Sequence, residues 1–124
     1  PDASLHIIPA GQVLAAFVRA VEAKGGVGNV ATRTDLFAKD ADGKLDQIHL
    51  NDMGNYLVAL THFTDLCHQS PIGRLHEMRR ADGSLADAPA PETALLMQQT
   101  VLTVVQSLPI TGVSQLSTAE SRQD

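Results

Sequence analysis

Apolar side chains recur at the spacing of a helix buried on one face in three stretches of the chain. The pattern predicts helices over residues 12–24, 52–69 and 91–108. In the first of them Val13 and Phe17 lie four residues apart on the apolar side, and charged residues occupy the opposite side. The chain is therefore expected to be rich in amphipathic helices.

Residues with known preferences for helix ends stand at the limits of these stretches. A pair of glycines follows the first helix, and Asn51 or Asp52 is placed to cap the second. Pro71 ends the second helix because proline lacks the backbone donor and disfavours helix at the residue before it. Pro91 suits the first position of the third helix, and Pro109 ends that helix.

The remaining segments are shorter or more polar. Residues 5–8 form an apolar run ended by Pro9, which predicts a buried strand. Such a strand followed by a helix is the unit of a parallel α/β sheet. Residues 35–37 are expected to be a short extended piece, residues 74–91 a polar surface connection, and residues 114–124 a frayed tail.

Composition narrows the classes of protein to consider. The 124 residues have room for one domain or a piece of a larger one, and 44% apolar residues allow a core built mostly of aliphatic side chains. The formal net charge is −5 and the densest basic spot is Arg79-Arg80, so nucleic-acid binding is not expected. No apolar run is long enough to span a bilayer. Cys67 is the only cysteine and is expected in the core.

Two loops superficially resemble ligand-binding loops. Residues 25–29, Gly-Gly-Val-Gly-Asn, are rich in glycine, but they follow a helix, whereas a phosphate loop precedes one. Residues 40–43, Asp-Ala-Asp-Gly, begin like a calcium loop, but the later ligands of such a loop are missing. A helix stop and a plain turn are the better interpretations of these segments.

Asp46 and His49 are the residues that point most clearly to a chemical function, namely acid–base chemistry. A carboxylate three residues before an imidazole can curl back and hold one ring nitrogen, which leaves the other nitrogen free to take a proton from a hydroxyl. The alternative is that Asp46 belongs to a turn and His49 bonds a helix end. A metal site made of Asp46, His49 and Asp52 is a further alternative, although no second histidine stands at a convincing spacing. Tyr56 is expected to serve packing.

The segment HLNDMGNYL at residues 49–57, preceded by Asp46, resembles the last catalytic segment of the SGNH (GDSL-type) hydrolases. In that family an Asp-x-x-His stands before the last core helix, with a glycine a few positions on. The resemblance extends to Ser-Pro-Ile-Gly at residues 70–73, and residues 5–9 with the helix after them resemble the last parallel strand and its helix. By position, Asp46 and His49 match the triad aspartate and histidine.

This resemblance implies the C-terminal part of a flavodoxin-like α/β/α sandwich that is helix-rich in this chain. Residues 1–75 would be the strand and helices of the SGNH-like domain. Residues 76–113 would be the surface connection and the C-terminal helix, and residues 114–124 a flexible tail. The implied activity is serine-dependent hydrolysis of an acyl or acetyl ester of a carbohydrate or lipid, with no cofactor.

The nucleophile of that family is not present in this chain. The Gly-Asp-Ser tripeptide does not occur in the sequence, and the similar Asp82-Gly83-Ser84 has another order. The oxyanion-hole segments of the family are missing too. We therefore expect a missing N-terminal segment or another chain to supply the serine. The same reasoning predicts that the apolar faces of the first two helices are left exposed or are covered by another copy or chain. The alternative function is a non-catalytic scaffold or a carbohydrate- or protein-binding domain.

Overall fold

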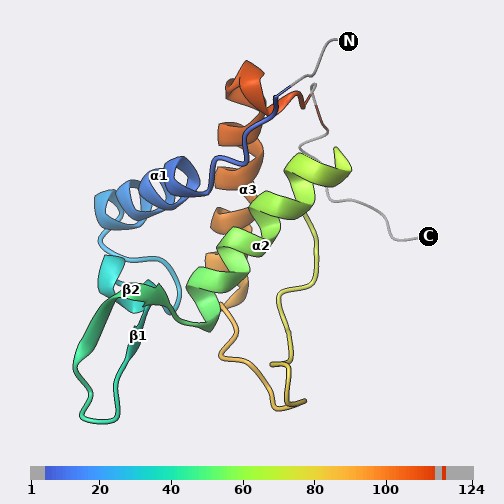
Figure 1. The fold of residues 1–124 in the computed structure, drawn as a ribbon. Coiled ribbons are helices and arrows are strands. Elements are labelled where there is room, and N and C mark those ends of the chain that lie inside the picture. Colours follow the sequence, from blue (N-terminus) through green and yellow to red (C-terminus); the bar gives the residue numbers. More distant parts are fainter. Residues whose placement is uncertain (1–4, 114–115, 117–124) are drawn as a thin grey trace.

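Three α-helices and a two-stranded antiparallel sheet make up the computed structural model of the protein (Figure 1), which describes residues 5–113 and 116. The chain is thus of mixed α/β type. In chain order the elements are α1 (Ala10–Ala23), the 3-10 turn η1 (Arg33–Leu36), β1 (Phe37–Lys39), β2 (Leu45–Leu50), α2 (Asp52–Cys67), α3 (Pro91–Ser107) and the 3-10 turn η2 (Pro109–Thr111).

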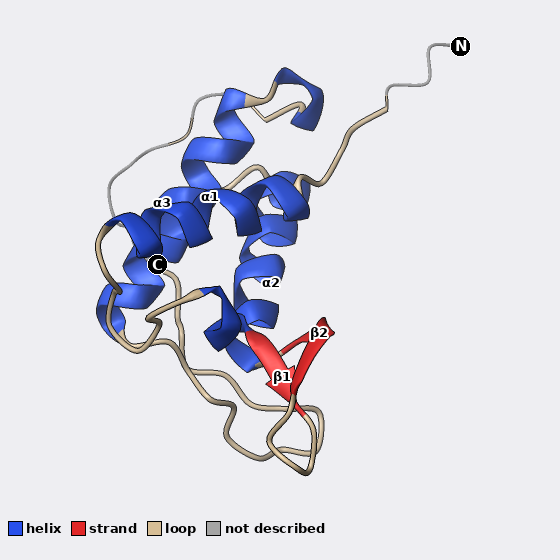
Figure 2. Ribbon diagram, turned by 90° about the vertical axis from the view of Figure 1, so that its left-hand side faces the viewer, coloured by secondary structure: helices blue, strands red, loops and turns tan. Residues whose placement is uncertain are grey.

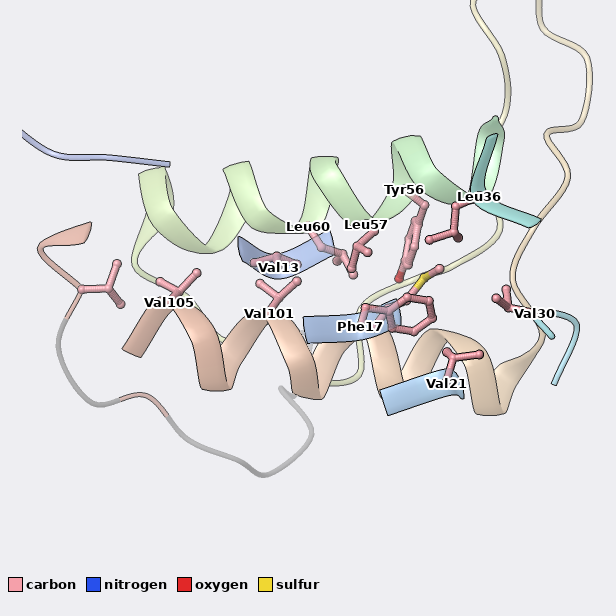
Figure 3. Packing of buried hydrophobic residues seen from close by; sticks show 12 residues of the cluster. Val13, Phe17, Val21, Val30, Leu36, Tyr56, Leu57, Leu60, Val101 and Val105 are labelled. Carbon is pink, nitrogen blue, oxygen red and sulfur yellow. The ribbon is translucent and has the colours of Figure 1, made fainter. Parts of the chain in front are cut away.

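The three helices pack on one another, and the hairpin of β1 and β2 projects from one end of them (Figures 1 and 2). Phe17 of α1, Leu57 of α2 and Val101 of α3 are fully buried where the helices meet (Figure 3). Burying one such side chain stabilises the fold by about 1.5–3 kcal/mol. The core comprises Val13, Phe17, Val21, Val30, Leu36, Tyr56, Leu57, Leu60, Met97, Val101, Val105 and Val113.

This packing corrects the expectation that the apolar faces of the first two helices would be exposed or covered by another chain. The buried faces of α1 and α2 meet each other and α3. Within the described part of the chain, α3 therefore covers the buried faces of α1 and α2. Large apolar side chains remain exposed elsewhere, with Leu5, Ile48 and Leu75 among the most exposed.

The starts of α2 and α3 agree with the local sequence signals, whereas α2 ends at Cys67, two residues earlier than predicted, with His68 in the left-handed conformation. Asn51 is the N-cap of α2, and its side-chain oxygen accepts a hydrogen bond from the Gly54 backbone N–H at 3.0 Å. Pro91 is the first residue of α3, as predicted, and α3 ends two residues before Pro109.

No helix in the described part of the chain is long and apolar enough to cross a membrane.

The predicted strand at residues 5–8 is wrong. This segment has no strand pairing, and the Leu5 side chain is 80% exposed. The Ile7 backbone N–H instead donates to the Ile110 carbonyl at 3.1 Å, and His6 Nδ1 lies 3.2 Å from the Thr111 carbonyl oxygen. An apolar run becomes a strand only where a neighbouring strand can pair with it, and this run lies beside the turn after α3.

A hairpin that the sequence pattern did not predict, made of β1 and β2, stands before α2. Its turn is closed by the Asp40 backbone N–H, which donates to the Lys44 carbonyl at 2.9 Å, and Gly43 has the positive φ of 79° that favours glycine. The Asp40 carboxylate accepts from the backbone N–H groups of Asp42 and Lys44. A plain turn, the favoured interpretation of residues 40–43, is therefore what forms.

The two strands are not in simple register. Phe37 pairs with Leu50 and Lys39 pairs with Leu45. Between these pairs β1 advances two positions, from 37 to 39, and β2 advances five, from 45 to 50, so β2 carries three more residues than its partner. A bulge of this kind bends a strand and re-aims its side chains. Residues 46–49, the Asp-x-x-His segment, lie within it.

The glycine-rich loop after α1 holds the start of α3. The Asn29 side chain donates to the Ala88 carbonyl at 3.0 Å and accepts from the Ala90 backbone N–H at 2.9 Å. The Thr93 hydroxyl donates to the Val27 carbonyl at 2.9 Å. The loop thus joins two distant parts of the chain, and its Asn29 backbone N–H also donates to the Thr93 hydroxyl at 3.2 Å.

The connection between α2 and α3 has no regular structure beyond one isolated bridge, from Arg79 to Leu85. It is tied to the first residue of α2, because the Arg80 guanidinium donates to the Asp52 carboxylate at 2.7 and 3.1 Å. The Asp87 backbone N–H donates to the same carboxylate at 2.8 Å. The connection is therefore fixed next to the end of β2.

The expectation that Cys67 lies in the core is wrong, because Cys67 is exposed.

Near its C-terminal end the buried face of α2 consists of Thr61, Thr64 and Asp65. Asp65 is only 4% exposed, and its Oδ2 atom has no hydrogen-bond partner among the described residues. Burial raises the pKa of Asp65 above its usual range, and charge on the nearby histidines His6, His68 and His62 partly opposes the shift.

Asp65→Asn is expected to stabilise the protein at pH 7. Because the pKa of Asp65 is raised in the folded state, ionisation of its carboxyl group destabilises the folded protein above that pKa. The destabilisation vanishes at a pH low enough to protonate the group in both the folded and the unfolded state. The variant should raise the free energy of unfolding at pH 7 by about 1–3 kcal/mol, and the gain should shrink as pH falls toward the usual aspartate range. Urea unfolding at several pH values measures it, with Asp42→Asn in the exposed turn as the control of equal charge. A loss of stability at pH 7 would contradict the argument.

Candidate functional site

Asp46 and His49 are brought together within the bulge of β2. The Asp46 Oδ2 atom lies 2.6 Å from His49 Nδ1. The Asp46 Oδ1 atom accepts the backbone N–H groups of Ile48 at 2.8 Å and His49 at 3.1 Å. The carboxylate therefore folds the local backbone and holds the imidazole at the same time, which is the contact that the three-residue spacing suggested.

The orientation leaves one nitrogen of His49 for other chemistry. With Nδ1 beside the carboxylate, Nε2 is the remaining ring nitrogen, and no described residue hydrogen-bonds to it. The His49 side chain is 75% exposed, whereas that of Asp46 is 33% exposed. A histidine whose Nδ1–H is held by a carboxylate has the tautomer in which Nε2 accepts a proton. The pair can therefore act as an oriented base toward a group that approaches from solvent.

The Asp46 carboxylate is strongly biased toward its charged form. The hydrogen bond from the Ile48 backbone N–H is the largest cause, followed by the bonds from the His49 ring and backbone, and together they lower the pKa of Asp46 to about 2. The carboxylate thus stays ionised at any pH at which a histidine can act as a base. An ionised partner is what stabilises an imidazolium during proton transfer.

The Asp46 pKa gives a direct test of this geometry. In carboxyl NMR, Asp46 should titrate with a midpoint of about 2, and His49→Ala should raise this pKa while leaving it below the ordinary 3.8, because the larger Ile48 contribution remains. Since the folded-state pKa is depressed, the associated stability is present above the usual aspartate pKa and is lost as pH falls toward 2. An unshifted Asp46 in the unaltered protein would show that the bonds do not persist in solution.

Asn51 fixes the position of this pair relative to the helices. Its side-chain nitrogen donates to the Asp35 carbonyl at 2.6 Å, its backbone N–H donates to the Leu36 carbonyl at 2.9 Å, and its side-chain oxygen caps α2. One residue therefore joins η1, the end of β2 and the start of α2. His49 stands two positions before it, so the ring is held on a short and anchored segment.

Gly54 makes this junction possible by having no side chain. A Cβ atom at this position would lie 2.5 Å from the Leu36 carbonyl oxygen and 2.9 Å from the Cβ of Leu50. The first turn of α2 can therefore approach η1 and the end of β2 closely. The sequence predicted Asn51 or Asp52 as the cap, and the structure shows Asn51. The junction itself was not predicted, although the spacing Asn51-x-x-Gly54 was the available signal.

The proposed metal set of Asp46, His49 and Asp52 is not brought together. The Asp52 carboxylate bonds to the Asp87 backbone N–H and to Arg80, which hold its pKa below the usual range. Within residues 5–113 and 116, no three histidine, cysteine or acidic side chains are grouped so that they could hold a metal ion. Asp52 is better described as an anchor of the connection between α2 and α3.

No serine of the described segments lies against His49. The hydroxyl of Ser70 accepts from the Ile72 backbone N–H, that of Ser84 donates to Asp82, and that of Ser107 donates to the Val104 carbonyl. Tyr56, expected to serve packing, is buried, and its hydroxyl donates to the Leu75 carbonyl. The described part of the chain thus presents an oriented base without a nucleophile.

Comparisons with protein families, with curated proteins and with solved structures found no match to this chain. The features of the chain that bear on function are therefore the geometry of the Asp46–His49 pair and the sequence motif around it.

Proposed function

We propose that this chain contributes the aspartate and histidine of a serine-dependent ester hydrolase of the SGNH (GDSL) type. In this proposal the chain is the helix-rich C-terminal part of a flavodoxin-like α/β/α domain. The substrate class is an acyl or acetyl ester of a carbohydrate or lipid. The observation that carries the proposal is the 2.6 Å contact between Asp46 Oδ2 and His49 Nδ1 inside a strand bulge.

Each residue has a defined role in the proposed reaction. His49 Nε2 takes the proton from the serine hydroxyl as the hydroxyl oxygen attacks the ester carbonyl carbon, and His49 then gives that proton to the leaving alcohol. Asp46 keeps the ring in the required tautomer and stabilises the imidazolium. In the second half of the reaction His49 activates a water molecule in the same way, which releases the acid and restores the serine.

The proposal requires a serine from outside these 124 residues. No Gly-Asp-Ser tripeptide occurs in the chain. The exposure of His49 is consistent with a nucleophile that approaches from another segment or chain, since a ring buried among its own neighbours could not be reached. Ile48, beside it, is 82% exposed, an apolar surface that such a segment would cover.

The alternative is a non-catalytic scaffold or a carbohydrate- or protein-binding domain. It predicts that His49 bonds the backbone instead of a carboxylate, whereas the observed partner of its ring is Asp46. A structural role for the bulge alone would need only the Oδ1 bonds of Asp46 to the backbone. The additional bond to the ring favours the catalytic proposal.

A fluorophosphonate probe tests the proposal on the protein together with the segment that carries its Gly-Asp-Ser sequence. The expected result is covalent labelling of that serine, located by peptide mass spectrometry, with hydrolysis of p-nitrophenyl acetate. Ser84→Ala should label equally well, because the Ser84 hydroxyl is engaged by Asp82 at 2.6 Å. An assembled protein that neither labels nor hydrolyses the ester would overturn the proposal.

A further inference from the structure

An apolar cavity of about 180 Å³ lies between α2 and the beginning of the connection that follows it, which runs beside the helix in Figure 1. Its lining is almost entirely apolar, and neither Asp46 nor His49 is part of it. The residues that line the cavity are Tyr56, Ala59, Leu60, Phe63, Arg74, Leu75 and Met78. Because this volume is smaller than the roughly 300 Å³ or more of sites for drug-sized ligands, the cavity suits a short hydrocarbon chain.

The wall of the cavity is fixed by a buried polar network. Gln98, which is 4% exposed, accepts the Gly73 backbone N–H at 3.0 Å and donates to the Arg74 carbonyl at 2.9 Å and to the Tyr56 hydroxyl at 3.2 Å. That hydroxyl donates in turn to the Leu75 carbonyl at 3.1 Å. A cavity whose wall is already ordered costs little conformational entropy when a ligand enters.

The only charged group of the lining is the guanidinium of Arg74. It lies 4.7 Å from the centroid of the Phe63 ring, and its Nε and Nη2 atoms donate to the Ser70 carbonyl and to the Gln69 side chain. No carboxylate in the described residues pairs with it, and its Nη1 atom has no acceptor there. The cavity therefore combines an apolar interior with one positive charge that lacks an opposite charge.

Two lining side chains stay exposed although they are apolar. Leu75 is 73% exposed and Met78 is 45% exposed. Binding of a hydrocarbon over these exposed apolar groups is favourable, because it removes their surface from water. The site thus offers apolar burial for a chain and a charge for a head group.

We propose that this cavity binds a short-chain carboxylate, such as hexanoate. The hydrocarbon lies among Phe63, Leu75 and Met78, and the carboxylate accepts hydrogen bonds from Arg74. Charge complementarity selects an anion over a neutral alcohol of equal length, because a hydrogen bond between charged groups is stronger than one between neutral groups. This binding site is separate from the Asp46–His49 pair and does not rest on the proposed hydrolase activity.

Titration of the 124-residue protein with hexanoate and with 1-hexanol, followed by backbone amide NMR, tests the proposal. Hexanoate should give saturable shifts at residues around the cavity with a dissociation constant of roughly 1 mM. Hexanol should bind about tenfold more weakly, since it lacks the charge. This comparison needs no altered protein, so it holds whether or not a variant folds.

Arg74→Gln should weaken hexanoate binding about tenfold and leave hexanol binding unchanged. Arg79→Gln is the matched control, because Arg79 belongs to the same connection but donates to the Gly83 carbonyl at 2.8 Å and does not line the cavity. His49→Ala should also leave hexanoate binding unchanged. The absence of saturable shifts, or equal binding of hexanoate and hexanol, would overturn the proposal.

Discussion

Replacing His49 with alanine is expected to lower kcat for ester hydrolysis by the assembled protein by roughly 10⁴- to 10⁶-fold. In the proposed reaction, His49 is the base that takes the proton of the attacking serine, and Asp46 orients its ring. Labelling of the serine by a fluorophosphonate should slow in parallel, because the same proton must leave the hydroxyl. Turnover of p-nitrophenyl acetate and the rate of labelling measure the two effects.

Two further variants separate a catalytic role from a structural one. Asp46→Asn keeps the side chain nearly the same size and should lower kcat by about 10⁴-fold, because the ring loses its carboxylate partner. His62→Ala should leave kcat unchanged, because His62 lies on the surface of α2, where its ring bonds the Val58 carbonyl at 2.8 Å. Unchanged turnover in His49→Ala, with the fold intact by circular dichroism, would exclude the proposed role.

Gly54→Ala is expected to destabilise the protein by about 1–3 kcal/mol, even though alanine is the better helix former. Helix propensity alone would favour the variant by about 1 kcal/mol. The added methyl group, however, would meet the Leu36 carbonyl oxygen at 2.5 Å and Leu50 at 2.9 Å. A backbone carbonyl cannot rotate out of the way as a flexible side chain can, so the steric term exceeds the gain in propensity.

Gly11→Ala supplies the matched control. Gly11 lies in the first turn of α1, and a Cβ atom there would have nothing within 4 Å. The variant should therefore gain up to about 1 kcal/mol in the free energy of unfolding. Urea unfolding of both variants measures the two opposite changes, and a stabilised Gly54→Ala would show that the junction relaxes.

Much of the helical architecture could be predicted because its signals are local. Pro91 and Asn51 mark helix starts through their own backbone and side-chain chemistry, and both stand where expected. The strand at residues 5–8 was wrong because strand formation depends on a pairing partner, which no local pattern reveals. Cys67 was placed wrongly because burial near the end of α2 depends on where its neighbouring helices lie.

The candidate site was only partly predictable for the same reason. The contact between Asp46 and His49 follows from a three-residue spacing and was foreseen. The bulge around it depends on how β2 pairs with β1, and the junction at Gly54 depends on how α2 approaches η1. Arg74 belongs to the predicted surface connection, and its stacking on Phe63 and its place at the cavity arise only in the folded chain.

The hydrogen bond from Ile7 to the Ile110 carbonyl has a consequence for the connectivity of the whole unit. It places the segment that leads into α1 beside the segment that leaves α3. The chain therefore enters and leaves the unit of helices and hairpin at neighbouring points. We expect this unit to tolerate circular permutation, with a short linker joining the two segments and new ends opened in the exposed turn at residues 41–43.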